Sequence, residues 1–284
     1  MRVQSLHVFP VKSTRGSALG EAAVERSGLR HDRRWMVATS DGHRLTAARN
    51  RQLMAITAVP DADGGLCLSA PHMDPVRVPQ PIDGQRVPVA IKRLPDARRA
   101  GDAADAWVTK VLGEPVRLLW LDDPARRLIA PEHGGLPGDP LSLADTAPML
   151  LTTTASLTRL NEWIANSDEP EPMIMDRFRP NIVIEGDVER FVEDTWERIR
   201  IGGIEYRFAE HCDRCVVPTI EPASLTSGKE PIRTLAQRRK WDGKVWFGVR
   251  LVPLGEGRIR VGDRVDVLAT RSRQPRSAAT SPGR

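Results

Sequence analysis

Two of the three cysteines in this 284-residue chain lie in one short segment, His211-Cys212-Asp213-Arg214-Cys215. Cysteine thiolates bind soft metals and take part in redox chemistry. An adjacent guanidinium stabilises a deprotonated thiol, so Arg214 makes Cys215 the better thiolate candidate of the pair. The segment therefore indicates metal or redox chemistry, and the residues around it decide between the alternatives.

Three ordinary explanations compete for this segment. A closed zinc site needs four ligands, and the chain offers only this pair, the neighbouring His211 and the distant Cys67. A thioredoxin-like dithiol begins a helix, whereas the β-branched residues and Pro218 after Cys215 predict a strand or a turn. Simple packing is the third, because free cysteine is often a small buried residue, but it leaves the polar Asp213-Arg214 insert unexplained.

The bulk composition is that of a soluble globular protein, with 40% hydrophobic and 28% charged residues. The length is enough for two ordinary domains. No apolar run approaches the roughly 20 residues of a membrane span, and the N-terminus lacks the apolar core of a signal peptide. An odd number of cysteines argues against a disulfide scaffold. These features predict a cytoplasmic protein with no membrane partner.

The net charge of +5 is weak evidence for nucleic-acid binding. Residues 271–284 carry four arginines and no acid and are rich in Ser, Pro and Ala, so we expect a disordered basic tail. Aromatic residues make up only 5% of the chain and form no basic–aromatic stripe, so no nucleic-acid partner is expected. Residues 1–60 hold ten Lys or Arg against four acids, which predicts a solvated face or an anion-binding site.

Short apolar runs separated by turn residues predict a mainly β protein with a few helices, an α+β fold. Helices are expected at 104–112, 157–164 and 231–240. Strands are expected at 6–9, 35–37, 53–56, 66–68, 87–91, 181–184, 198–201, 206–209, 245–252 and 258–261. A Pro- and Gly-rich stretch at 122–140 is typical of a connection between domains. We therefore expect one domain over 1–125 and a second over 126–270.

Several separated motifs occur in an order that is specific to one superfamily. They are Phe9-Pro10-Val11-Lys12-Ser13, Asp32-Arg33-Arg34-Trp35, Asp145-Thr146-Ala147-Pro148, Phe178-Arg179-Pro180-Asn181, Cys212-Asp213-Arg214-Cys215, Lys229-Glu230-Pro231, Phe247-Gly248 and Val261-Gly262-Asp263. With them the chain resembles the MOSC superfamily and its companion N-terminal β-barrel domain over residues 1 to about 268. Within that superfamily it is most similar to the amidoxime-reducing components and their bacterial relatives.

The resemblance implies two β-barrel domains and a molybdenum cofactor, in which a pterin dithiolene holds the metal. It implies that Cys215 is the protein ligand to molybdenum and the catalytic residue. The matching cofactor-binding positions are Lys12, Ser13, Arg33, Asp145, Thr146, Arg179, Asn181, Arg214 and Cys215. The implied reaction is a two-electron reduction of N-hydroxylated small molecules, from N–OH to N–H. A non-catalytic carrier of molybdenum cofactor or sulfur is the alternative.

The resemblance also implies a separate electron donor, because the chain has no Gly-x-Gly-x-x-Gly fingerprint and no iron–sulfur cysteine motif. A ferredoxin-, flavin- or cytochrome b5-type reductase would serve. Asp145 and His211 are the nearest candidates for a general acid, although a structural role is expected for both. Ala144 and Ala147, where relatives often carry serine, together with Asp213 and Glu221 depart from the family pattern and bear on substrate range.

Local chemistry predicts how three of the cations are presented. Lys12 follows a strand, so it is expected at a strand end, where a loop can offer a cation to phosphate. Arg33 and Arg34 are expected in a strand and therefore on opposite faces. Arg179 precedes Pro180, which predicts an extended backbone and a fixed guanidinium.

Overall fold

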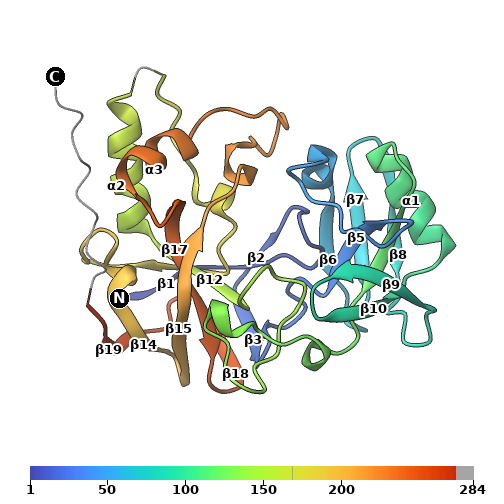
Figure 1. The fold of residues 1–284 in the computed structure, drawn as a ribbon, viewed down its shortest axis with the longest axis horizontal. Coiled ribbons are helices and arrows are strands. Elements are labelled where there is room, and N and C mark those ends of the chain that lie inside the picture. The colour runs from blue at the N-terminus through green and yellow to red at the C-terminus, as the bar shows by residue number, and fades with distance from the viewer. Residues whose placement is uncertain (168, 273–284) are drawn as a thin grey trace.

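The computed structural model describes residues 1–167 and 169–272, and it has two lobes that lie side by side (Figure 1). The small lobe contains β5 to β11 and α1, and the large lobe contains β1 to β4 together with the elements from β12 onward. Strands dominate both lobes. The predicted fold class, mainly β with a few helices, is therefore confirmed.

A long sheet forms the frame of the large lobe. Its strand order is β19-β14-β15-β17-β12-β13-β1-β2, with β16 paired to β17, and only β12 and β13 run parallel. A small sheet, β18-β3-β4, shares its apolar core. The strands are β1 (Arg2–Val8), β2 (Ser17–Leu19), β3 (Glu21–Glu25), β4 (Gly28–Leu29), β12 (Met149–Thr153), β13 (Ile182–Glu185), β14 (Trp196–Ile201), β15 (Ile204–Asp213), β16 (Lys240–Trp241), β17 (Lys244–Pro253), β18 (Gly257–Arg260) and β19 (Val265–Thr270).

The small lobe combines two sheets with one helix. The sheets have the orders β5-β11-β10-β9 and β6-β7-β8. The helix α1 (Asp102–Leu112) buries Trp107, Val108 and Leu112 in a core shared with both sheets. The strands are β5 (Trp35–Thr39), β6 (Thr57–Pro60), β7 (Leu66–Ala70), β8 (Met73–Val78), β9 (Arg86–Ile91), β10 (Leu94–Arg99) and β11 (Val116–Trp120).

Two further helices cover the large lobe. Leu160 and Ile164 of α2 (Thr154–Ala165) and Leu235 of α3 (Ile232–Arg238) pack with Phe247 of β17. The 3-10 helices are η1 (Arg51–Ala55), η2 (Pro124–Arg126), η3 (Pro131–His133), η4 (Met175–Phe178), η5 (Val192–Thr195) and η6 (Val217–Thr219). Within the described ranges, no helix is long and apolar enough to cross a membrane.

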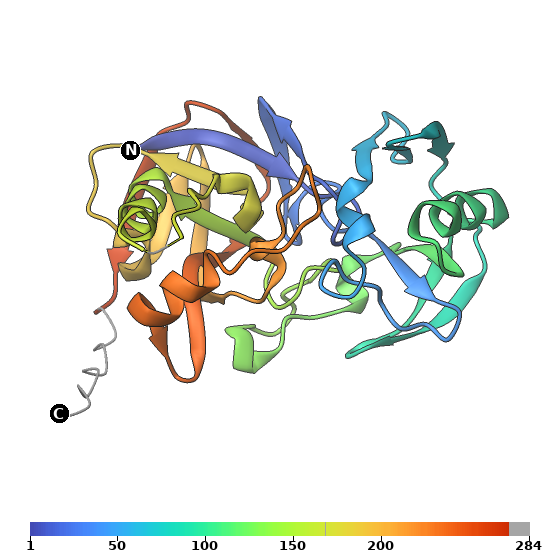
Figure 2. The same cartoon turned by 90° about the horizontal axis from the view of Figure 1, so that it is seen from above.

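The N-terminal segment joins the large lobe before the chain enters the small one. β1 pairs with β13 and β2, and β3 pairs with β18 near the other end of the chain. Seen from above, β1 runs from the N-terminus across the large lobe toward the small lobe (Figure 2). Residues 2–29 therefore pack with the C-terminal strands, although they belong to the predicted first domain in the sequence. The predicted domain boundary at residue 125 stays a prediction.

The helices follow the sequence pattern closely, whereas one predicted strand is wrong. α1 ends at Gly113, whose φ of 70° and bond to the Thr109 carbonyl form a left-handed cap. Residues 53–56, predicted as a strand, instead lie mostly in η1. The Asn50 side chain accepts from the Gln52 amide and begins this helical turn, so a local cap outweighs the β-like composition.

The predicted disordered tail, residues 271–284, lies outside the described residues except for Arg271 and Ser272. Arg271 belongs to the fold, and the prediction is wrong for this residue. Its backbone amide donates to Thr195, and its guanidinium lies 3.3 Å from the ring centroid of Phe208.

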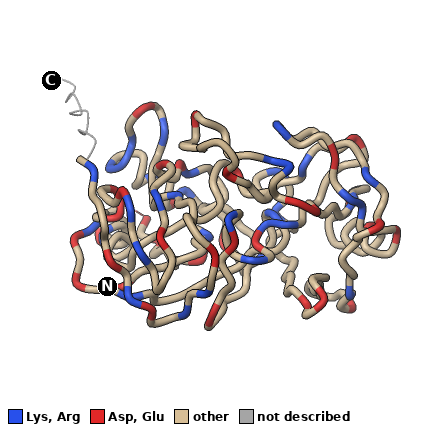
Figure 3. Tube along the Cα trace, turned by 90° about the horizontal axis from the view of Figure 1, so that it is seen from below, with Lys and Arg blue, Asp and Glu red and all other residues tan. Residues whose placement is uncertain are grey.

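The excess Lys and Arg side chains of residues 1–60 have different partners in the structure. Basic and acidic residues alternate over both lobes (Figure 3). Arg2, Arg26 and Arg30 pair with Glu185, Asp139 and Glu25. These three cations are ion-paired at the surface, as expected of a solvated face, whereas Lys12 contacts Leu143 and Asp145 before β12. The anion-binding site stays a prediction.

Glu193 of η5 is a buried residue with no exposed surface, and its carboxyl group lies against the start of α2. One carboxylate oxygen accepts from Ser156 Oγ at 2.9 Å, while the other has no hydrogen-bond partner among the described residues. Burial, reinforced by Asp194, raises the pKa of Glu193 to about 7. Because the folded-state pKa lies above the unfolded one, stability is greatest at low pH and is lost as pH rises through about 7.

We expect Glu193→Gln to be more stable than the parent above pH 8 and equal to it at pH 3.5, below the unfolded pKa of the carboxyl. Glutamine does not ionise, so the variant avoids a cost of up to about 3 kcal/mol at high pH. Urea unfolding at both pH values measures the difference. Exposed Glu256→Gln is the control and should give no pH-dependent difference. An equal effect of Glu193→Gln at both pH values would contradict the assignment.

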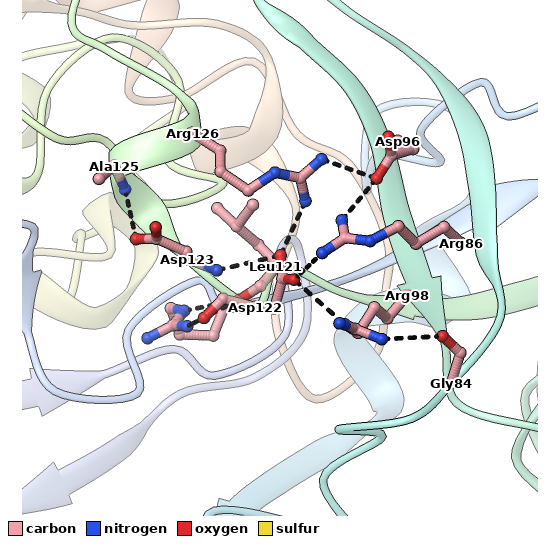
Figure 4. Close-up of polar contacts among 10 residues, drawn as sticks. Gly84, Arg86, Asp96, Arg98, Leu121, Asp122, Asp123, Ala125 and Arg126 are labelled. Carbon is pink, nitrogen blue, oxygen red and sulfur yellow. Dashed lines mark hydrogen bonds and ion pairs between the residues drawn. The ribbon is translucent and has the colours of Figure 1, made fainter.

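Asp122 connects the small lobe to the chain that leaves it (Figure 4). Its carboxylate accepts from Arg98 Nε at 3.1 Å and from Arg126 at 2.7 Å, and also from Arg86. Asp96 accepts from Arg86 and Arg126, each at 2.7 Å. Burial opposes ionisation, but the bonds from Arg126 and Arg98 hold the Asp122 pKa well below its usual range.

Asp122→Asn should lower the free energy of unfolding by about 2 kcal/mol, because three guanidinium groups lose a shared anion. Thermal or urea unfolding measures the loss. The neighbouring Asp123 only caps η2 through the Ala125 amide at 2.8 Å, a role that asparagine fills equally well. Asp123→Asn is thus a matched control, and equal losses in the two variants would refute the role of the network.

Candidate cofactor site

Lys12 lies beyond the end of β1, as predicted, and is 7% exposed. Its ammonium donates to the Leu143 carbonyl at 2.9 Å and to Asp145 at 2.6 Å. The Asp145 side chain is 63% exposed, and Arg44 approaches it at 3.6 Å. A buried cation is therefore held beneath an acid that faces solvent, and this acid comes from the large-lobe loop before β12.

Arg33 and Arg179 lie against the ring of Phe9. Their guanidinium carbons are 4.6 and 4.2 Å from its centroid. Arg33 also donates to Asp32 at 2.5 Å and to the Asn181 side chain at 2.9 Å, while Arg179 donates to the Thr14 carbonyl at 2.6 Å. Two motifs that are about 145 residues apart are thus brought together.

The backbone at three predicted site residues is left-handed. The φ angles of Ser13, Arg33 and Arg179 are 70°, 48° and 58°. Such angles are uncommon outside glycine and cluster at ligand sites, where surrounding contacts hold them. Two predictions are therefore wrong: Arg179 is not extended, and Arg33 and Arg34 lie in a turn before β5 rather than in a strand. The two arginines still diverge, because Arg34 donates to the Leu121 carbonyl.

Asn181 is fully buried, and its side chain is used inside the protein. Its oxygen accepts from Arg33 at 2.9 Å and from the Leu150 amide at 3.1 Å, and its nitrogen donates to the His7 carbonyl at 3.2 Å. It therefore connects β1, β12 and β13 and positions Arg33. This arrangement favours a positioning role over direct ligand contact.

The cysteine pair is asymmetric in the structure. Cys212 is buried and Cys215 is exposed. Arg214 donates to Cys212 Sγ at 2.9 Å and to the Phe178 carbonyl at 2.8 Å, so its observed contact is with Cys212 and not with the neighbouring Cys215. The Arg214 Nε is buried without a hydrogen-bond partner among the described residues.

The charges of the site favour an anion. Burial lowers the pKa of Lys12 to about 8 although Asp145 opposes the shift. Burial, followed by repulsion from Arg33, lowers the pKa of Arg179 to about 9, and Arg214 adds to that repulsion. Lys12 holds the pKa of Asp145 well below its usual range, so this acid is ionised at neutral pH. Lys12 and Arg44 share Asp145, and Arg33 pairs with Asp32, so these cations and Arg179 outnumber the acids. An added anion would relieve their repulsion.

Two functional candidates were not found from the sequence. Glu210 accepts from the Thr146 hydroxyl, from His133 at 2.9 Å and from Arg250 at 2.7 Å. Arg250 also contacts Asp213 at 3.0 Å. Glu210 and Arg250 thereby tie the Asp145-Thr146 loop to the cysteine segment. Pairing of β15 with β17 places them together, and neither residue stands in a recognisable motif.

The remaining polar candidates lie in different surroundings. Thr146 borders a cavity of about 260 Å³ that Asp145 also lines. A cavity of about 570 Å³ lies between the small lobe and residues 222–225, but none of the predicted site residues lines it. Ser13 is half-buried beside Lys12.

His211 lies among aromatic rings, away from Lys12, Arg33 and Arg179, and its ring contacts Arg271 at 3.1 Å. Its ring packs against Phe208, Trp241 and Trp246 at centroid distances of 5.4, 5.6 and 5.8 Å. Burial lowers the pKa of His211 to about 4. Cys67 is exposed in β7 of the small lobe, and the described residues contain no cluster of three or more His, Cys, Asp or Glu suited to a metal ion.

The sequence of this chain is similar to those of known proteins in both parts. Residues 1–115 match the MOSC N-terminal beta barrel domain, and residues 138–266 match the MOSC domain. Human mitochondrial amidoxime-reducing component 1 is 32% identical over 94% of this chain and 82% of its own. The rat mitochondrial amidoxime reducing component 2 is 31% identical over 93% and 82%.

These matches define the class as a MOSC protein with an N-terminal MOSC barrel. The chain belongs to the family of the mitochondrial amidoxime-reducing components. Zebrafish molybdenum cofactor sulfurase is 31% identical over 87% of this chain but only 31% of its own length. The solved YUAD protein of Bacillus subtilis covers 93% of both chains at 9% identity with a TM-score of 0.42, too low to support an argument.

Proposed function

We propose that this protein binds a molybdenum cofactor and uses it to reduce N-hydroxylated small molecules with electrons from a separate donor protein. The observation that carries the proposal is a group of four cations, Lys12, Arg33, Arg179 and Arg214, set against two acids, Asp32 and Asp145. The exposed thiol of Cys215 follows Arg214 directly in the sequence. The names of the relatives support the substrate class. The three free cysteines fit a reducing compartment such as the cytoplasm.

The residues present fit a pterin that ends in a phosphate. Lys12, Arg33, Arg179 and Arg214 would hold the anionic parts, and the unpartnered Nε of Arg214 is a donor suited to such a ligand. Ser13, Asp145 and Thr146 would hydrogen-bond the polar ring, while Asn181 positions Arg33. The exposed sulfur of Cys215 would bind the metal. When bound, the cofactor supplies two-electron redox chemistry coupled to oxygen transfer.

Neither of the two candidate general acids, Asp145 and His211, is suited to donate a proton to the substrate at neutral pH. Asp145 is ionised at neutral pH and accepts hydrogen bonds, so it is not assigned as a proton donor. His211 is buried among aromatic rings, and its lowered pKa keeps it neutral. The chain's contribution is therefore to bind and orient the cofactor, while solvent reaches the exposed Cys215 side.

A carrier of molybdenum cofactor or sulfur is the second candidate, favoured by the similarity to molybdenum cofactor sulfurase. Such a protein would hold the cofactor or a sulfur atom without turnover. The exposed Cys215 suits either role, so only a turnover measurement separates them.

The test uses the full chain purified from a molybdenum-sufficient host. We expect molybdenum and pterin in stoichiometric amounts and reduction of benzamidoxime to benzamidine with a reduced viologen dye as donor. Cofactor without turnover would favour the carrier. Stoichiometric zinc without molybdenum or pterin would refute both the reductase and the cofactor carrier.

A further inference from the structure

We propose that a basic cavity beside Asp145 binds an anionic group of the substrate, so that this protein prefers N-hydroxylated compounds carrying a carboxylate. The inference rests on the proposed reductase function and adds a substrate class to it. Nothing in the motif pattern points to this cavity, because most of its cations lie outside the matching motifs.

Four segments that are distant in sequence enclose the cavity. They are the segment after β5 that holds Arg44, the turn between β9 and β10, the connection at 127–133 and the loop that leads to Asp145 and Thr146. Its volume is about 260 Å³, which suits a small charged group better than a whole drug-sized ligand. The cavity therefore offers room for one end of a substrate.

The lining carries more positive than negative charge. Its cations are Arg44, Lys92, Arg93 and Arg127, and its acids are Glu132 and Asp145. Asp145 is already engaged by Lys12 at 2.6 Å.

Glu132 lies 3.2 Å from Lys92 and 3.7 Å from Arg93, and its side chain is 52% exposed. Exposed ion pairs of this kind are weak, so a ligand anion can replace Glu132 as their partner.

Arg127 and the outer arginines have different roles. Arg127 is 7% exposed and donates to the carbonyls of Ser142 and Ala144, so it is fixed to the loop before Asp145. Burial lowers its pKa to about 10, and repulsion from Arg44 and Arg93 acts in the same direction. Arg44 and Arg93 each make only one long ion pair in the described structure, at 3.6 and 3.7 Å, which leaves N–H groups for a ligand.

The cavity adjoins the cofactor site through a shared wall. Asp145 lines the cavity and also binds Lys12, whose ammonium lies buried behind it. A substrate held by its carboxylate between Arg44 and Arg93 would lie next to the proposed cofactor residues. Such anchoring by a remote group lowers the barrier by orientation.

The cofactor's own phosphate is the other possible source of an oxyanion. The test therefore measures molybdenum and pterin content together with substrate preference. The variants are Arg93→Gln and the double change Lys92→Gln with Arg93→Gln. Arg200→Gln is the matched control, because Arg200 lies on β14 of the large lobe, is similarly exposed and pairs with Glu205 of β15.

The molybdenum-loaded protein is given 4-carboxybenzamidoxime and benzamidoxime, with binding measured by calorimetry and turnover with a reduced viologen dye. We expect kcat/KM of the parent to favour the carboxylated compound. In Arg93→Gln the ratio of the two kcat/KM values should fall about tenfold, the effect of losing one charged hydrogen bond. Arg200→Gln should keep the parent ratio, and the cofactor content should stay constant throughout.

The outcomes separate this inference from the proposed function. Selective binding of the carboxylated compound without any reduction would support the anion site and sink the reductase proposal. Reduction of both compounds with equal kcat/KM would keep the reductase and overturn the anion site. Loss of molybdenum and pterin in Arg93→Gln would also overturn it, because the cavity would then hold the cofactor.

Discussion

Cys215→Ala is expected to lower kcat/KM for benzamidoxime by at least about a hundredfold, since Cys215 is the proposed metal ligand and losing it should cost more than losing an outer-shell partner. The fold should be unaffected, because the side chain is exposed and its truncation opens no core cavity. Turnover measures the loss of activity, molybdenum content measures metal binding, and circular dichroism measures whether the fold is kept.

The other two cysteines provide graded controls. Cys67→Ala removes a second exposed thiol, in β7 of the small lobe, and should leave turnover unchanged. Cys212→Ala removes the buried sulfur that accepts from Arg214 at 2.9 Å, so a smaller loss, about tenfold, is expected from the displaced guanidinium. Full activity in Cys215→Ala would refute the assignment of this residue.

Lys12→Met should weaken cofactor retention about a hundredfold, the effect of losing a charged hydrogen-bond donor from a buried position. The cofactor-free protein should be as stable as the parent or more stable. Burial already disfavours the Lys12 ammonium, whose pKa is lowered to about 8, and methionine fills the same space without a charge. Asp145 stays solvated and keeps Arg44 at 3.6 Å, so no buried acid is left alone.

Opposite effects on stability and retention are what distinguish a ligand-binding lysine from a structural one. Pterin fluorescence after extensive dialysis measures retention, and thermal unfolding of the cofactor-free protein measures stability. Lys229→Met, which removes an exposed cation paired with Glu169 at 3.4 Å, controls for net charge. A large drop in the melting temperature of cofactor-free Lys12→Met would show that the lysine serves the fold.

Much of the architecture follows from local patterns in the chain. The period of apolar residues and Gly113 predict α1, and the alternating runs predict most strands. η1 was missed because Asn50 caps a turn whose apolar residues suit a strand. At Arg179, contacts with Thr14 and Phe9 outweigh the extended preference that Pro180 imposes.

For the candidate site too, the sequence predicts some features and not others. Its residues could be named from motifs, and their roles toward a cofactor stay predictions. The structure brings Arg33 and Arg179 together on the ring of Phe9. Their partners could not be named, because side-chain direction depends on tertiary packing. Irregular pairing of β15 with β17 near Asp213 sends this acid toward Arg250, and Arg214 reaches Cys212 instead of Cys215. Glu210 and Arg250 lie 40 residues apart, and no local signal joins them.

The pairing of β1 with β13 and of β3 with β18 has a consequence for synthesis on the ribosome. The first strands to emerge must wait for partners translated more than 150 residues later. Until then Lys12 and Arg33 have emerged, but Arg179 and Cys215 have not joined them. On the proposed function, capture of the cofactor would therefore follow completion of the large lobe.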